Sequence, residues 1–292
     1  MKPTVHGLGT ADAPRTDIDP RVNRLPRLER MAFAAVREAL GGRSLPDSLA
    51  LVFGTGYGGL AATEAFLKGV ASRGMAYGSA TAFHQSVHHS PAGQLSLLLG
   101  IRGPVLTVSQ RELSGEAALR VGLTLLDRFE FVLVVAADEK TAVLEAAYRA
   151  FGGLFQAGEG AAAILLGRGK GPLWIERCEL FSHPTSVRRF ASPIRFGPRL
   201  AAALTSAHGR AVSIAAPTGD VERHERAVVG RKGQILQDQA ALEQVGFHPS
   251  AGLVRSVLAA QYLLTSPHES ACVVHGLALG GAQSITVLRR DS

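Results

Sequence analysis

The feature that most constrains the fold is the segment 129–137 (FEFVLVVAA), in which every residue except Glu130 is apolar. A strand with one face in water alternates polar and apolar side chains, whereas a strand covered on both faces is apolar throughout. In α/β proteins this cover is usually provided by helices. The segment therefore predicts an α/β protein in which this strand lies in the middle of its sheet.

Further apolar runs alternate with helical patterns along the chain. In the first half we predict strands over residues 49–53, 105–109 and 161–166, and helices over 58–69 and 114–127. In the second half we predict strands over 212–215, 271–276 and 284–289, and a helix over 252–264. The repeated order predicts an internal duplication with one layer of helices buried between two sheets. We place the halves at 1–180 and 181–292, joined by a linker within 181–198, and expect them to form one compact unit.

The composition limits where the chain works. With 292 residues, 46% of them hydrophobic, it can bury a large core, and no apolar run approaches the ~20 residues that span a bilayer. The N-terminal residues lack the apolar segment of a signal peptide, and two cysteines are too few for a disulfide framework. We therefore expect a cytoplasmic protein.

The formal net charge of +7 has two explanations. It can reflect a general preference for arginine, or a surface that meets an acidic partner such as a carrier protein or a nucleic acid. Four tyrosines and one tryptophan leave little for stacking on bases, and no nucleic-acid-binding motif is present. Nucleic acid is therefore a poor candidate.

Two motifs that suggest a cofactor or a metal are better explained otherwise. Glycines 54, 56 and 59 have the spacing of a dinucleotide-binding turn, but no acidic residue stands ~20 positions later to bind a ribose. His84 and His88 have i, i+4 spacing, but no carboxylate or cysteine nearby in sequence completes a metal shell. We predict no cofactor and no metal, and we interpret these histidines as structural or interface residues.

Two further groups are interpreted as ordinary structure. Cys178 and Cys272 are expected in the core, because both lie in strand-like segments and neither stands at a turn. His224, with Glu222 and Glu225, has the pattern of a solvent-facing helix.

The segment 100–126 (GIRGPVLTVSQRELSGEAALRVGLTLL) resembles the nucleophile region of β-ketoacyl synthases. That region has a Gly-Pro pair, a strand ending in Thr-Val-Ser, the catalytic cysteine after two more residues, and a small-residue pair that opens a long helix. Further matches keep the order of the family: residues 51–60 (LVFGTGYGGL), 158–166 (GEGAAAILL) and 275–290 (HGLALGGAQSITVLRR). Residues 83–93 (FHQSVHHSPAG) resemble the Ser-Val-His-Asn-Ala signature of a short ketosynthase-like subgroup of aryl-polyene and similar pathways. The resemblance implies a thiolase-like, five-layered α-β-α-β-α fold.

The chain departs from the family at the residues that carry the chemistry. In register, the nucleophile position holds Glu112. The first catalytic histidine is replaced by Ala216, and the second position falls on Gly246, with His248 two residues away. The loop expected to line the acyl pocket and bind the oxyanion comprises Ser109, Leu279, Gly280 and Gly281, with Leu279 in place of the usual phenylalanine.

Glu112 has two interpretations. A carboxylate at the N-terminus of a buried helix can fill the vacated site through hydrogen bonds to exposed amides, and chain-length-factor subunits carry the near-isosteric glutamine there. Alternatively, it is a general base for hydrolysis or decarboxylation. In neither case can it hold an acyl chain as a thioester.

The resemblance implies a non-catalytic, chain-length-factor-like subunit that pairs with an active β-ketoacyl synthase in fatty-acid-like or polyketide biosynthesis and can meet an acidic acyl carrier protein. The alternatives are a Glu112-dependent thioester hydrolase, acyltransferase or decarboxylase-like enzyme, and a stand-alone acyl-binding or scaffold protein. Thiolase-fold dimers resemble one another in pairing the strand before the nucleophile across a two-fold axis. This implies a homo- or heterodimer interface at Phe83, His84, His88, Pro104, Leu106 and Val108.

Overall fold

The computed structural model describes residues 2–15, 19–46, 48–150, 157–182, 198–207, 212–213, 225–227, 229, 246–278 and 281–291. The strands within these ranges are β1 (Pro3–Ala11), β2 (Ala50–Gly54), β3 (Val105–Val108), β4 (Phe131–Asp138), β5 (Gly160–Arg168), β6 (Leu173–Ser182), β7 (Val212–Ser213), β8 (Ala271–Leu277) and β9 (Ala282–Arg290). The helices are α1 (Pro20–Asn23), α2 (Arg27–Leu40), α3 (Leu60–Arg73), the short 3₁₀ helix η1 (Met75–Tyr77), α4 (Ala80–Ser86), α5 (Ser90–Leu99), α6 (Ser114–Leu125), α7 (Ala142–Ala150), α8 (Pro198–Ser206) and α11 (Ala251–Thr265).

The strands follow the order β3-β2-β4-β5-β1-β6-β9-β8-β7. β4 lies between β2, to which it is parallel, and β5, to which it is antiparallel. Every residue of β4 after Phe131 is buried. The prediction that this strand is central and covered on both faces is confirmed.

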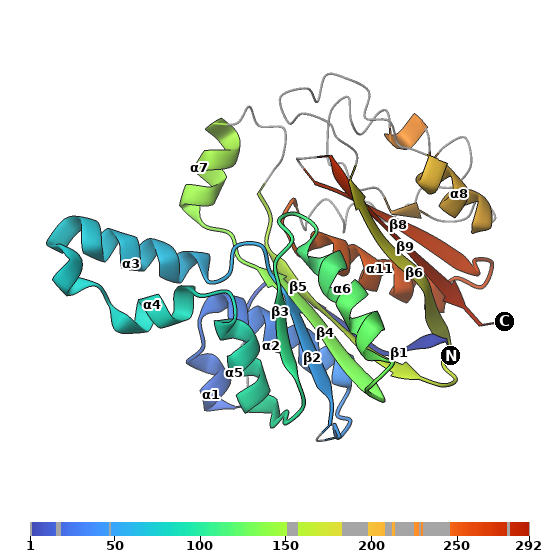
Figure 1. The fold of residues 1–292 in the computed structure, drawn as a ribbon, viewed down its shortest axis with the longest axis horizontal. Helices are drawn as coiled ribbons and strands as arrows, with labels where there is room; N and C mark the ends of the chain where they lie inside the picture. The colour runs from blue at the N-terminus through green and yellow to red at the C-terminus, as the bar shows by residue number, and fades with distance from the viewer. Residues whose placement is uncertain are drawn as a thin grey trace.

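The sheet consists of two parts joined by a short contact. β3, β2, β4, β5 and β1 form the first part, and β6, β9, β8 and β7 form the second. The parts meet where Thr4 and Val5 of β1 pair with Trp174 and Leu173 of β6. Because only two residue pairs join them, the two parts can diverge and enclose helices between them, as Figure 1 shows.

The alternation of side chains along the strands separates the layers. In the first part, Leu133 and Val135 of β4 pack with α2, whereas Val132 and Val134 pack with the central helices α6 and α11. In the second part, Cys272 and Val274 of β8 face that same central layer. The intervening residues of β8 pack with α8 on the outer face. The layers are therefore α2, first sheet, α6 with α11, second sheet, and α8, which is the predicted five-layered thiolase-like arrangement.

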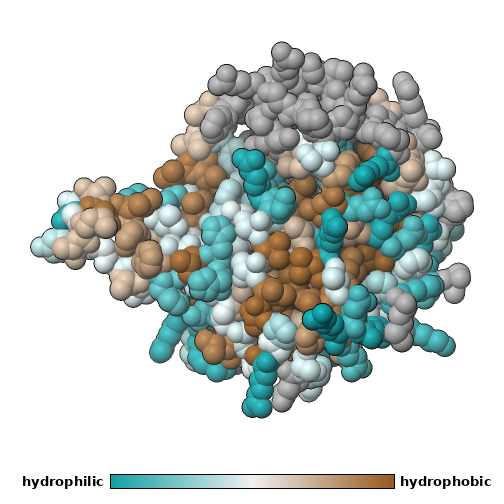
Figure 2. Space-filling model, in the orientation of Figure 1, coloured by the Kyte–Doolittle hydropathy of each residue, from teal (hydrophilic) through white to brown (hydrophobic). Residues whose placement is uncertain are grey.

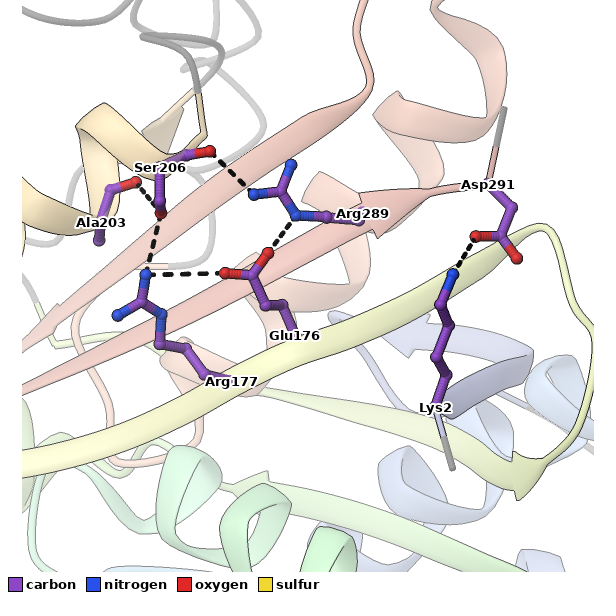
Figure 3. A network of polar contacts seen from close by, with 7 residues as sticks. All are labelled: Lys2, Glu176, Arg177, Ala203, Ser206, Arg289 and Asp291. Carbon is purple, nitrogen blue, oxygen red and sulfur yellow. Dashed lines mark hydrogen bonds and ion pairs between the residues drawn. The ribbon is translucent and has the colours of Figure 1, made fainter.

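Polar contacts at the surface fix the outer helix α8 to the second sheet (Figure 3). Arg177 of β6 donates to the hydroxyl of Ser206 at 2.9 Å, and Arg289 of β9 donates to the carbonyl of Ser206 at 2.8 Å. Glu176 accepts from Arg289 between the two strands. These contacts hold the C-terminal end of α8 over the sheet.

A helical arm projects from the body (Figure 1). It consists of α3, η1 and α4, and none of these three elements has a buried residue. Phe66 and Phe83 contact each other across it, with ring centroids 5.5 Å apart. The arm is thus held together by this aromatic contact, and its described residues do not belong to the buried core.

Most of the predicted elements are found, with ends that differ by a few residues. The helix predicted over 58–69 begins at Leu60 and continues to Arg73. The strand-like segment around Cys178 is the strand β6. The prediction did not include β1, α1, α2, η1, α4, α5, α7 and α8. The linker predicted within 181–198 is wrong at its start, where Phe181 and Ser182 still pair with β9, and most of the rest lies outside the described residues. The division at residue 180 stays a prediction.

No helix within the described ranges has the length and apolar character needed to cross a membrane.

Candidate functional site

The turn that joins β3 to α6 is a strained elbow. Arg111 has φ of 52°, the one positive φ among the non-glycine residues of the described chain. Residues with a side chain disfavour this left-handed backbone conformation, and they adopt it mainly where surrounding contacts impose it. Here Ser114 imposes it, because its hydroxyl donates to the carbonyl of Arg111 at 2.7 Å and accepts from the amide of Gln110 at 2.9 Å. The next residue after the strained one is Glu112.

Glu112 is half-buried and is not bound as expected. Within the described residues, no hydrogen bond involves its carboxylate. The amides at the start of α6 have other partners: the Ser114 amide donates to the Arg111 carbonyl at 3.3 Å, and the Gly115 amide donates to the Pro249 carbonyl at 3.1 Å. The predicted hydrogen bonds from these amides to Glu112 are therefore not formed.

Beneath the elbow, Asp138 at the end of β4 joins three segments of the chain. Its Oδ1 accepts from the Thr55 hydroxyl at 2.8 Å and from the amides of Gly56 and Tyr57, each at 3.0 Å. Its Oδ2 accepts from the Ser250 hydroxyl at 2.5 Å. Burial raises the pKa of Asp138 to about 6, although these hydrogen bonds oppose the shift. Of the amides in the turn 54–59 that could have met a phosphate, those of Gly56 and Tyr57 are thus bonded to Asp138, and that of Gly58 donates to the Thr55 hydroxyl at 3.0 Å.

The same turn carries one of two paired tyrosines. The hydroxyls of Tyr57 and Tyr148 lie 2.6 Å apart, and the ring of Tyr148, from α7, contacts Phe247 edge-on at 6.1 Å. Burial raises the pKa of both phenols, and the negative charges of Asp138 and Glu112 raise both further. The charge of Glu112 thus acts on the pair.

His248 is buried next to the start of α11. Neither ring nitrogen has a hydrogen-bond partner among the described residues. Burial and the charge of Arg255 lower its pKa to about 3, so the imidazole is neutral. His248 thus makes no hydrogen bond to the elbow, and Gly246, the position in register, has φ of 66°.

A buried set of charged residues between α6, α11 and the second sheet was not predicted. Glu116 accepts from Ser284 at 3.0 Å and lies 3.9 Å from the guanidinium of Arg255. His275 contacts Glu225 at 2.6 Å and Gln283 at 3.1 Å. Glu225 is completely buried, so its assignment to a solvent-facing helix is wrong. A charged residue inside the apolar helix of residues 114–125 was the available signal for Glu116.

Two glycines make room for the Glu116 side chain. A Cβ atom on Gly252 would lie 1.9 Å from its carboxyl carbon, and a Cβ atom on Gly276 would lie 2.2 Å from its Oε1. Burial raises the pKa of Glu116 above its ordinary value, opposed first by the charge of Arg255. The carboxyl group therefore fills a space that two facing glycines provide.

Of the residues predicted for the acyl pocket and the oxyanion loop, only some can be placed. Ser109 is exposed at the end of β3. Gly281 has φ of 80°, and its amide donates to the carbonyl of Ala278 at 2.9 Å. Leu279, Gly280 and Ala216 lie outside the described residues. The predicted pocket thus stays a prediction.

The residues predicted for a dimer interface are mostly at the surface. β3 is an edge strand, and Leu106 on it is 39% exposed. Pro104 is exposed and Val108 is half-buried. Phe83 is 57% exposed on α4, next to the exposed His84. These residues lie on or next to α4 and β3, and α5 connects these two elements along the chain.

The histidines and cysteines supply no metal site in this part of the chain. α4 ends at Ser86, so His84 and His88 do not share a helix, and the Nε2 of His88 lies 3.3 Å from the carbonyl of Gly56. Among the described residues, no group of three His, Cys, Asp or Glu could hold a metal ion. Cys178 and Cys272 are buried and form no disulfide bond with each other, which confirms the prediction that they belong to the core.

Comparison with solved structures relates the chain to ketosynthases. A type II polyketide synthase acyl-carrier protein in complex with its ketosynthase bound to the hexaketide matches at TM-score 0.79 and 16% identity, covering 100% of both chains. The ishigamide ketosynthase/chain length factor matches at TM-score 0.76 and 18% identity, again over 100% of both chains. A ketosynthase in complex with its chain length factor from Xenorhabdus doucetiae matches at TM-score 0.71 and 14% identity, over 99% of this chain and 98% of that chain. At these identities the likeness establishes the fold.

Sequence comparison establishes the family. No curated protein sequence matches the chain. A family model described as beta-ketoacyl synthase, N-terminal domain, matches residues 12–180, more than half of the 292 residues. This stretch contains the elbow, the turn after β2 and the edge strand β3, and the chain therefore belongs to the β-ketoacyl synthase family.

Proposed function

We propose that this chain is a non-catalytic ketosynthase-fold subunit, similar to a chain length factor, that pairs with an active β-ketoacyl synthase in polyketide or fatty-acid-like biosynthesis. The observation that carries the proposal is Glu112 at the strained elbow. A carboxylate cannot hold an acyl chain as a thioester and is a far weaker nucleophile than a thiolate. The chain keeps the shape of the family's elbow without the group that forms the covalent bond.

The surroundings of Glu112 support this proposal. Acid–base catalysis at this position would need a proton-transfer group within hydrogen-bond reach of residue 112. The histidine nearest to the expected second position, His248, is buried, neutral and without a hydrogen bond. Asp138 is directed to the turn 54–59 and to Ser250. Neither group serves Glu112 as a base.

The edge strand β3 supports the pairing. It bonds only β2 in the described sheet, so its other edge has free backbone groups that can pair with a second chain. Val105 and Leu106 are 38% and 39% exposed there. Figure 2 shows apolar surface where Figure 1 draws β3 and α6. A flat apolar edge of this kind is expected to be covered in the functional assembly.

The partner is inferred from the related structures. Two of them contain a ketosynthase together with a chain length factor, and one contains an acyl-carrier protein with its ketosynthase. We propose a heterodimer with an active ketosynthase, in which two such edge strands meet about a pseudo-two-fold axis. An acidic acyl carrier protein is the second partner that we propose, in keeping with the net charge of +7. The cytoplasmic location stays a prediction.

Pairing is tested by co-expressing the chain with a ketosynthase that has an intact catalytic cysteine and is encoded next to it. We expect a one-to-one complex by native mass spectrometry, and we expect Leu106→Lys to abolish it because a charge would be buried in the interface. Leu264→Lys is the matched control, since Leu264 is also exposed, at 44%, but lies at the end of α11. A stable homodimer that does not bind the ketosynthase would instead support a stand-alone acyl-binding or scaffold protein.

Catalytic inactivity is tested on the isolated chain. Incubation with acyl-carrier thioesters should leave its intact mass unchanged, and no condensation product should form. An acyl adduct mapped to residues 108–115 would overturn the proposal.

A second candidate function rests on the exposure of Glu112. The carboxylate is half-buried and without a hydrogen bond in the described chain, so it could act as a general base for thioester hydrolysis. Glu112→Gln would then remove roughly 10²–10⁴-fold of the hydrolysis rate without loss of stability. An active parent with a stable but inactive Gln variant would favour this function over the first.

A further inference from the structure

Within the described residues, the helix α7 is attached to the rest of the protein mainly by contacts near its two ends. None of its residues is fully buried, and Leu144, Glu145, Ala147 and Tyr148 are half-buried. At its start, the hydroxyl of Thr141 bonds to Glu64 of α3, and the amide of Lys140 donates to Glu159 at 3.1 Å. In its last turn, Tyr148 bonds to Tyr57 and contacts Phe247. A helix with so little buried surface can move without disturbing the core.

Tyr57, to which α7 is bonded through Tyr148, lies by contrast in a turn that is held firmly. The amides of Gly56 and Tyr57 both donate to Asp138, which is completely buried and bonded on its other oxygen to Ser250. A Cβ atom on Gly56 would lie 2.9 Å from the carbonyl oxygen of Arg111 and 2.3 Å from the ring of Pro249. The turn that carries Tyr57 therefore rests directly on the backbone of the elbow.

We propose that the Tyr57–Tyr148 pair controls access to position 112. The hydrogen bond between the phenols latches the movable helix α7 to the fixed turn beside the elbow. When it breaks, α7 moves away and the side chain at position 112 becomes accessible. The influence of the Glu112 charge on both phenols is consistent with this placement. The inference does not depend on pairing with a ketosynthase, so its failure would leave the proposed function unaffected.

The test uses a reporter thiol in the full chain. Glu112→Cys places an alkylatable group at the elbow, and its rate of reaction with iodoacetamide is followed by peptide mass spectrometry. In this background, Tyr148→Phe removes one hydroxyl and keeps the ring. We expect the rate to rise about three- to tenfold, the range for the loss of one hydrogen bond.

The double variant gives the sharpest result. Tyr57→Phe should raise the rate as much as Tyr148→Phe, and the two together no more than either alone, because both remove the same bond. Tyr77→Phe is the matched control: Tyr77 is 61% exposed on η1 and should leave the rate unchanged. The buried Cys178 and Cys272 should stay unlabelled throughout.

Three results would overturn the proposal. The first is an unchanged rate in both single variants. The second is an additive effect in the double variant, which would mean that the phenols act separately. The third is parallel labelling of Cys178, which would show that the substitutions loosen the whole fold rather than α7.

Discussion

The carboxylate of Glu112 is expected to contribute little to the stability of the fold, although it lies in the elbow between β3 and α6. It is half-buried and makes no hydrogen bond within the described chain. Substitutions at such positions usually change the free energy of unfolding by less than about 0.5 kcal/mol. We therefore expect Glu112→Gln and Glu112→Ala to melt within about 2 °C of the parent. A large loss in the Ala variant alone would show that the side chain fills a cavity after all.

Asp138 should give the protein a distinct pH dependence. Its pKa in the folded protein, about 6, exceeds the ordinary value of 3.8, so the folded state binds the proton more tightly than the unfolded state. The group therefore contributes most to stability below pH 3.8, and this contribution is lost as the pH rises to about 6. Asp138→Asn has no carboxyl to titrate, and its amide can still accept from the turn and donate to Ser250.

The expected difference can be measured by urea unfolding. The stability of the parent minus that of Asp138→Asn should fall by about 1–3 kcal/mol between pH 4 and pH 6.5. Taking the difference removes the titration of all other groups. A difference that stays constant over this range would contradict the assigned pKa.

At the scale of elements, the central layer depends on space left by glycines. Gly252→Ala would drive a methyl group into the carboxyl group of Glu116, and we expect a loss of about 1–3 kcal/mol in stability. The loss should shrink in a Glu116→Ala background, where the space is free. Gly93→Ala in α5, where no atom lies within 4 Å of the added Cβ, is the matched control and should be neutral or stabilising by up to about 1 kcal/mol. Equal losses at both glycines would contradict the packing argument.

How far the sequence predicts an element depends on what buries it. β4 could be predicted because both its faces are covered, which leaves an uninterrupted apolar run. β1 was missed because its sequence, PTVHGLGTA, includes two glycines. They are there because α2 packs so closely that a Cβ atom on Gly9 would lie 2.0 Å from the carbonyl oxygen of Ala35. The close approach of a helix thus removes the pattern by which a strand is recognised.

In the candidate site, too, some features could be predicted from the local sequence and others could not. The elbow and the position of Glu112 followed from the order of local motifs. The Asp138 network and the set around Glu116 could not be predicted, because their members lie up to 168 residues apart and only the fold brings them together. The wrong assignment of Glu225 has the same cause, since its partner His275 is 50 residues away.

At the scale of the molecule, the shared central layer predicts a single unfolding transition. α6 from the first half and α11 from the second belong to one hydrophobic cluster, and so do residues of both sheets. Trp174, the one tryptophan, lies at the β1–β6 junction and reports on the contact between the sheets. Its fluorescence and the far-UV circular dichroism should therefore change together as urea is raised. Two separated transitions would show that the halves are independent domains.

The position of β1 has a consequence for the order of folding. Its Thr10 pairs with Ala162, and its Thr4 pairs with Trp174, so β1 contacts residues that are synthesised 152 and 170 positions later. Until β1 docks, the buried strand β5 has an open edge over residues 161–168, and Leu173 and Trp174 of β6 have no strand partner on that side. Contacts this distant along the chain form slowly, because a long loop must close first. The nascent chain is therefore most vulnerable to aggregation in the interval between the emergence of β5 and the return of β1, and a chaperone that shields strand edges would act in that interval.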